Sequence, residues 1–154
     1  MATTIPFPRR SSDAARVRRN KTMLLPMPRA TADALALQVH LALAALRGGF
    51  ATNSHAQTLL QTQVLASSIV DAGYGELTPD DARRADDALL ACFERGNREG
   101  VWQLDDAACD ALARIVTVYD SQLHSVPLWV LVEANERLHR MSAGDAGRAQ
   151  RKRA

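Results

Sequence analysis

Residues 32–47, ADALALQVHLALAALR, constrain the fold more than any other stretch of this chain. Every second residue from Leu35 to Leu43 is apolar, which is the period of a strand, but alanine fills most of the gaps and the run exceeds normal strand length. Thr31 precedes the run as an N-cap, and Gly48 follows it as a left-handed C-cap. The run therefore predicts a helix, and a helix that is apolar on nearly all sides is expected to be central and buried.

Four further segments place apolar residues at helical spacing, and short loops marked by glycine or proline separate them. Thr78, Asp105 and Ser125 are the expected N-caps of the last three, and Gly96 is the expected end of the helix that follows Thr78. The sequence predicts an all-α protein, a compact bundle of about five largely antiparallel helices. The four further helices are expected at about residues 53–72, 79–95, 105–123 and 125–141.

Charge divides the chain into three parts, although the formal net charge is only +2. Residues 1–30 hold seven basic side chains and one acidic one, and they contain four prolines and no sustained periodicity. Residues 31–142 hold eight basic and fifteen acidic side chains, and residues 143–154 hold four basic and one acidic. We therefore expect a disordered basic arm, an acidic helical domain and a basic C-terminal tail, with these boundaries.

Nothing in the sequence indicates a membrane span, because no apolar run approaches the roughly 20 residues that a spanning helix needs. The first residues lack the apolar stretch of a secretory signal, and prolines there count against the amphipathic helix of a transit peptide. Cys92 and Cys109 lie within helical patterns and are interpreted as small core residues of a reduced protein. We expect a cytoplasmic protein.

The sequence shows no pattern typical of catalysis or metal binding. The four histidines lie on different expected helices, and the two cysteines stand seventeen positions apart without a CxxC pair. Paired aspartates occur at helix starts, and acids precede arginines at i, i+4, as Asp80 precedes Arg84, which is typical of a solvated helix surface. No nucleophile motif or phosphate-binding glycine loop is present. We therefore expect no enzyme activity, no cofactor and no metal.

Nucleic-acid binding is expected from the arms rather than from a folded motif. The best helix-turn-helix candidate, joined by RGGFATN, has no Arg or Lys between Gly48 and Asp81 with which to meet phosphate. Arginine makes up seventeen of the nineteen basic residues, and its side chain suits bidentate phosphate contacts. The competing interpretation is that the arms only solubilise the domain or bind its own acidic surface. The expected phosphate contacts are Arg9, Arg10, Arg16, Arg18, Arg19, Lys21, Arg148, Arg151, Lys152 and Arg153.

A second candidate surface lies in VPLWVLVEANERL, whose consecutive apolar residues are too many for one core-facing stripe. Either the start of this helix is buried on all sides, or one face, formed by Trp129, Leu128 and Val132, binds a partner. A homodimer formed in this way would double the basic arms and raise their avidity for nucleic acid.

Four stretches carry a resemblance to a known family: LQVHLALAALRGG, VLASSIVDAGYG, VWQLDDAACDALARIVTVYDSQL and VEANERL. They make residues 31–138 similar to small proteins of proteobacteria that are labelled as regulators of the Fis (factor for inversion stimulation) family. The resemblance implies a bacterial transcriptional regulator that binds DNA. Members of that family carry a C-terminal helix-turn-helix, whereas the corresponding end here, LHRMSAGDAGRAQRKRA, is too short and contains two glycines. No DNA-reading residue of the family is therefore carried over.

The first hypothesis is a non-catalytic regulatory or accessory protein that contacts nucleic acid non-specifically through its arms. The alternative is a protein-interaction module, a homo-oligomer or adaptor, whose arms are only solubilising. A third is an enzyme or small-ligand binder built from dispersed residues such as His40. Basic side chains directed away from the acidic domain favour the first, arms lying on that domain favour the second, and a closed polar pocket around His40 favours the third.

Overall fold

The computed structural model describes residues 10–152, with side chains from Ala14 onward. Over this range the chain is all-helical, with no strand, which confirms the expected fold class. None of these helices combines the length and apolar character needed to cross a membrane. The helices are α1 (Arg10–Leu24), α2 (Arg29–Gly48), α3 (Asn53–Asp71), α4 (Pro79–Glu99), α5 (Asp106–Ser125) and α6 (Leu128–Arg151).

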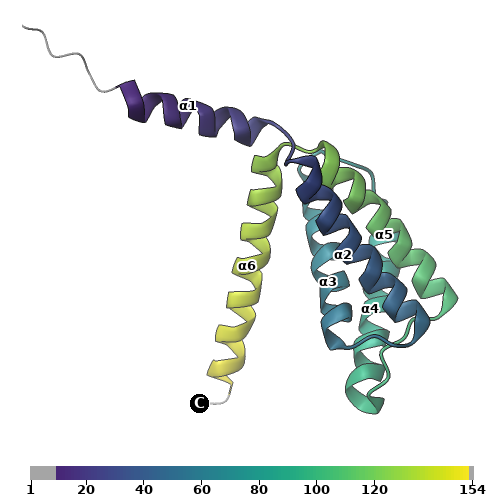
Figure 1. Cartoon of the computed structure of the whole chain (residues 1–154). Helices are drawn as coiled ribbons and strands as arrows, with labels where there is room; N and C mark the ends of the chain where they lie inside the picture. Colours follow the sequence, from purple (N-terminus) through teal and green to yellow (C-terminus); the bar gives the residue numbers. More distant parts are fainter. Residues whose placement is uncertain (1–9, 153–154) are drawn as a thin grey trace, which may run out of the picture.

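Four of the helices, α2 to α5, form a body to which the other two are attached (Figure 1). Each body helix packs on the next in the chain, and α5 also packs on α2 and α3. The core is therefore centred on α5, which buries large side chains such as Leu112, Ile115 and Leu123. α6 packs on α3, and α1 packs on α6 rather than on the body.

The expectation that residues 32–47 form a helix buried on nearly all sides is wrong. Leu37 and Leu41 are 57% and 58% exposed, whereas one side of α2 faces the core and buries Ala32, Ala36, Val39, Ala42, Ala45 and Leu46. Four of these six buried residues are alanines, so α2 presents a mainly small-residue side to the core while Leu37 and Leu41 remain outside. The alternating pattern of the sequence could not show which of two apolar sides would be buried.

Much of the described part of the two expected disordered arms is helical. Residues 10–24 form α1, because the four prolines of this region lie outside that stretch and its four arginines and two alanines are good helix formers. α6 continues without a break to Arg151, so the expected boundary at residue 142 lies within a helix. Residues 1–9 and 153–154 lie outside the described part of the chain.

Two of the expected N-caps are confirmed. The Thr78 hydroxyl accepts a hydrogen bond from the Asp81 backbone N–H at 3.0 Å, and the Asp105 carboxylate accepts one from the Ala108 N–H at 2.8 Å. The Asp81 carboxylate in turn accepts a hydrogen bond from the Thr78 N–H, which is the main reason why the pKa of Asp81 is lowered. These caps fix where α4 and α5 begin.

The other expected caps are displaced. α2 begins at Arg29 after Pro28 rather than after Thr31, and α6 begins at Leu128 after Pro127 rather than after Ser125. Proline suits such positions because its fixed φ is compatible with the helix and the missing N–H is not needed there. At the end of α2 the left-handed residue is Gly49, with φ 77°, one position later than expected.

Gly96 does not end α4, which continues to Glu99 and is capped by Gly100. The role of Gly96 is instead to make room for Trp102: a Cβ on Gly96 would lie 2.5 Å from the indole ring. The same indole meets Phe93 edge to face, with ring centroids 5.7 Å apart. The glycine is therefore a packing residue inside the helix.

Replacing Gly96 by alanine should destabilise the protein, although alanine is by itself about 1 kcal/mol better than glycine in a helix. Overpacking against Trp102 should lower the free energy of unfolding by about 1–3 kcal/mol. Gly144→Ala is the matched control, because a Cβ there meets nothing within 4 Å. Urea denaturation followed by circular dichroism measures both. Equal stability of Gly96→Ala and the wild type would contradict the packing role of Gly96.

Candidate nucleic-acid interface

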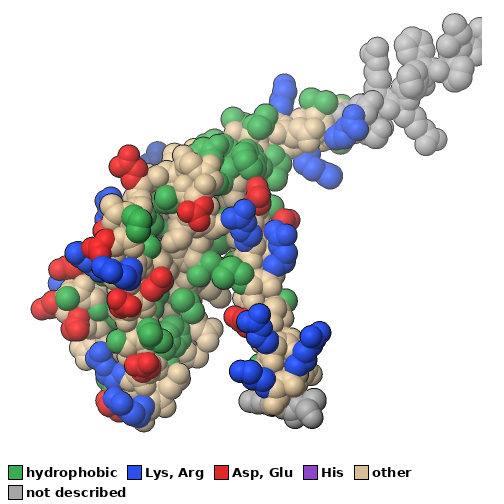
Figure 2. All heavy atoms as spheres, turned by 180° about the vertical axis from the view of Figure 1, so that it is seen from behind, with side chains coloured by type: hydrophobic (Ala, Val, Ile, Leu, Met, Phe, Trp, Pro, Cys, Tyr) green, Lys and Arg blue, Asp and Glu red, His purple; other side chains and the backbone are tan. Residues whose placement is uncertain are grey.

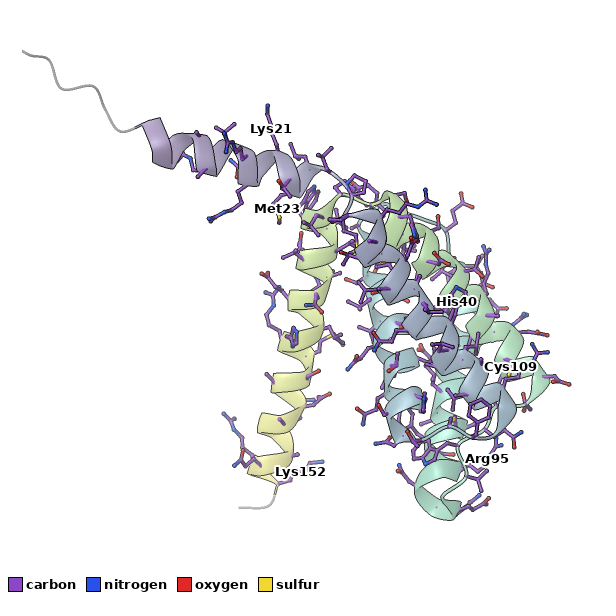
Figure 3. All side chains as sticks on the ribbon, viewed as in Figure 1. Lys21, Met23, His40, Arg95, Cys109 and Lys152 are labelled. Carbon is purple, nitrogen blue, oxygen red and sulfur yellow. The ribbon has the colours of Figure 1, made fainter. Side chains whose placement is uncertain are left out.

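The basic side chains of α1 lie on a helix that extends away from the body (Figure 3, Lys21). Arg16, Arg18, Arg19 and Lys21 are all exposed. Their spacing distributes them around α1 instead of along one side. A hydrogen bond from the Leu128 N–H to the backbone carbonyl of residue 25, 2.8 Å long, joins the end of this segment to the start of α6.

α6 has a packed half and a projecting half. Val130, Leu131 and Ala134 are buried in the core of the protein, whereas every residue from 139 to 152 is exposed. Lys152 stands just beyond the far end of α6, well away from Lys21 on α1 (Figure 3). The projecting half therefore offers its entire circumference to a partner.

One side of α6 carries a basic stripe, which sequence reasoning only half recognised. Arg137, Arg140, Arg148 and Arg151 are spaced at i, i+3, i+11 and i+14, which places them on one side of a helix. Fourteen residues of helix span about 21 Å. Arg137 and Arg140 were missed because they were counted with the acidic domain; the signal that could have found them is this helical spacing.

Most described arginines of residues 29–125 form ion pairs with carboxylates, and Arg47 and Arg95 are the exceptions. In the body, Arg84 binds Asp80 at 2.8 Å, which confirms the expected i, i+4 pair, and Arg114 lies 4.0 Å from Asp81 of another helix. Across the described residues, no salt bridge is formed by Arg18, Arg19, Lys21, Arg148, Arg151 or Lys152.

The charges of the molecule are thus separated in space as well as in sequence. Residues 29–125 hold seven basic and thirteen acidic side chains. Figure 2 shows acidic side chains spread over the body, while lysine and arginine predominate along α1 and the projecting half of α6. The structure brings the two basic sets onto helices that meet at one end and diverge (Figure 1). Arg9 and Arg153 lie outside the described residues, and Arg10 begins α1 without a described side chain.

The three residues of the expected partner surface do not share one face. Leu128 and Val132 line a hollow between α6, α2 and α3, whereas Trp129 is not among its lining residues. Trp129 is 40% exposed, and Leu24 and Leu25, from the segment that joins α6, are 66% and 60% exposed. Trp129, Leu24 and Leu25 belong to the region where α1 meets α6, and we call them the α1–α6 apolar patch.

His40, the residue considered for a dispersed site, lies in a surface network and not in a closed pocket. Its imidazole is half exposed and its Nε2 lies 2.9 Å from the Asp120 carboxylate. His124 Nε2 lies 2.7 Å from Asp33 of α2, and His124 Nδ1 lies 2.8 Å from the Asp120 backbone carbonyl. Both ring nitrogens of His124 face acceptors, an arrangement that favours the doubly protonated imidazolium. The hydrogen bond to Asp33 is the main cause of the raised pKa of His124.

Protonated His124 ties α5 to α2, so this contribution to stability should depend on pH. A raised pKa in the folded state means that the stabilisation is complete below about pH 6.5 and is lost as the pH rises through the folded pKa. The stability difference between wild type and His124→Gln, from urea denaturation, should therefore be larger at pH 6 than at pH 8.5. His139→Gln, which removes an exposed imidazole on α6, is the control. A difference that grows with pH would contradict this assignment.

No group of three or more His, Cys, Asp or Glu among the described residues could hold a metal ion. Cys92 and Cys109 are free and buried, as expected for core residues, and burial raises the pKa of both thiols, which lowers their reactivity at neutral pH.

Comparison with protein-family models, with curated proteins and with solved structures gave no match.

Proposed function

We propose that this protein is a non-catalytic regulatory or accessory factor that binds the phosphate backbone of nucleic acid through α1 and α6. The observation that carries the proposal is the direction of the basic helices. Both helices extend away from the acidic body. Apart from Arg16, the described basic side chains that were expected to contact phosphate form no salt bridge with any described residue. Arms that only neutralised their own domain would lie on its acidic helices instead.

The length of the basic stripe on α6 suits a polyanion. Duplex DNA carries one phosphate per roughly 1.7 Å of axis, so the 21 Å between Arg137 and Arg151 spans about a dozen phosphates. Arginine guanidinium groups bind phosphate oxygens in a bidentate manner without reading the bases. The expected binding is therefore non-specific in sequence and steeply dependent on salt. The resemblance to proteins labelled as Fis-family regulators points to the same class of ligand.

The acidic body limits how nucleic acid can approach. Its excess of carboxylates repels phosphate, so a bound strand has to lie along α1 or the projecting half of α6. The body is then free to hold another protein or a second copy. The α1–α6 apolar patch lies outside the body and offers a separate surface for a protein partner, because Trp129 is large, exposed and of the type enriched at interface hot spots.

The test is fluorescence anisotropy of full-length protein with a labelled 20-base-pair duplex across a salt series. We expect the logarithm of the affinity to fall linearly with the logarithm of the salt concentration. The variant Arg148→Gln/Arg151→Gln/Lys152→Gln removes three cations from α6. It should reduce the magnitude of that slope by about 2–3, because each lost phosphate contact removes about 0.9.

The matched control is Arg47→Gln/Arg83→Gln/Arg98→Gln, which removes the same charge from exposed positions of the body. It should leave the slope nearly unchanged. Absence of binding above background at low salt would refute the proposal, and so would an equal loss in the two triple variants. A labelled single-stranded RNA of the same length, run in parallel, shows which nucleic acid the helices prefer.

A further inference from the structure

A mainly apolar groove lies between α2, α3 and α6, next to Tyr119 and Leu123 of α5. Its volume is about 400 Å³, within the roughly 300–1,000 Å³ typical of small-molecule sites. Buried core residues, including Ile69, Leu123 and Leu131, lie at its base. Leu35 of α2 and Val132 of α6 are 36% and 38% exposed and line it from opposite sides. The groove exists because α6 packs on α3 and not on α2.

The lining of this groove carries no charge. None of its fifteen residues is Asp, Glu, Lys, Arg or His, in a chain of which 23% of the residues are charged. Four other hollows each include both acidic and basic side chains, such as Asp86 and Arg137 in one and Glu76 and Arg114 in another. A charged group entering the neutral groove would lose its hydration without gaining a partner, which is strongly unfavourable.

The lining does contain neutral hydrogen-bonding groups. Gln38, Gln61 and Asn135 contribute exposed amides at the rim, and none of them hydrogen-bonds to another described residue. The Tyr119 hydroxyl also has no such partner, and burial raises its pKa, so it stays a neutral donor. A bound molecule can therefore bury apolar surface against the base of the groove while it forms hydrogen bonds to the amides at the rim.

We take a small molecule rather than a partner helix as the occupant, because the volume of about 400 Å³ falls within the range of small-molecule sites.

We propose that the groove between α2, α3 and α6 binds a small, uncharged and mainly apolar molecule that carries amide- or hydroxyl-type hydrogen-bonding groups. The apolar portion of the ligand contacts Ile69, Leu123 and Leu131, and its polar groups face the rim amides. Such a ligand joins α6 to α2, two helices that otherwise have few direct contacts. This site is independent of the proposed nucleic-acid interface, because it uses none of the basic residues.

The test uses two fluorescent probes with the same aromatic skeleton and the full-length protein. N-phenyl-1-naphthylamine is neutral, and 8-anilinonaphthalene-1-sulfonate adds a sulfonate. We expect the neutral probe to bind one-to-one and saturably, with a blue-shifted emission, and the sulfonate to bind at least tenfold more weakly. Leu35→Lys should weaken binding of the neutral probe at least tenfold, because it places a charge at the groove.

Leu37→Lys is the matched control, since it makes the same change on an exposed leucine of α2 that does not line the groove. It should bind the neutral probe as the wild type does. Val132→Lys repeats the test from α6 if circular dichroism shows that Leu35→Lys is unfolded. The proposal is overturned if the neutral probe does not saturate, if both probes bind equally, or if the groove and control variants bind alike. Dimerisation that Leu35→Lys abolishes, without probe binding, would assign the groove to a second copy instead.

Discussion

The contact between the first turns of α6 and the body is the interaction on which both proposed sites depend. Val130, Leu131 and Ala134 bury the start of α6 in the core, and burial of one such aliphatic side chain is worth about 1.5–3 kcal/mol. The same contact fixes the direction in which residues 139–151 project and forms one side of the neutral groove. α1 depends on it as well, because α1 is attached through α6. A small apolar contact therefore positions both basic helices.

The two projecting helices receive little stabilisation from the rest of the protein. α1 and the end of α6 bury almost no apolar surface, so their helices gain little from packing and must rely on propensity and on a partner. Gly144 and Gly147 weaken α6 further, and a Cβ at either would meet nothing in the structure. Binding a polyanion would neutralise the clustered charge and supply the stabilisation that the body does not provide. The excess of carboxylates on the body would repel a polyanion and so direct it to the projecting helices, as the proposed function requires.

Several features of the fold could be predicted from local sequence, and others could not. Thr78 and Asp105 were recognised as caps because capping depends on a few adjacent residues. Gly96 was misread as a helix end because its partner, Trp102, acts through a packed side chain that no local pattern reveals. The buried side of α2 was misjudged because both of its sides are apolar, and the choice between them was made by packing on α5.

The candidate sites likewise combine residues that the sequence alone reveals with residues that only tertiary packing brings together. The basic residues on α1 and at the end of α6 were found from charge counting, which needs no three-dimensional information. Arg137 and Arg140 were missed because they join the stripe only once α6 is known to continue past residue 142. The groove could not be predicted, since Leu35, Ile69 and Val132 come together only through tertiary packing. Trp129 is exposed, whereas Leu128 and Val132 line the groove, so the structure separates the three residues that were expected to form one partner face.

The most direct test of the central claim is amide hydrogen exchange of the full-length protein with and without a duplex oligonucleotide at low salt. If the projecting basic helices hold the phosphate backbone, exchange should slow in residues 10–24 and 139–151 and remain unchanged in α4 and α5. Protection confined to α4 and α5, or no protection anywhere at a duplex concentration that saturates binding, would contradict the account.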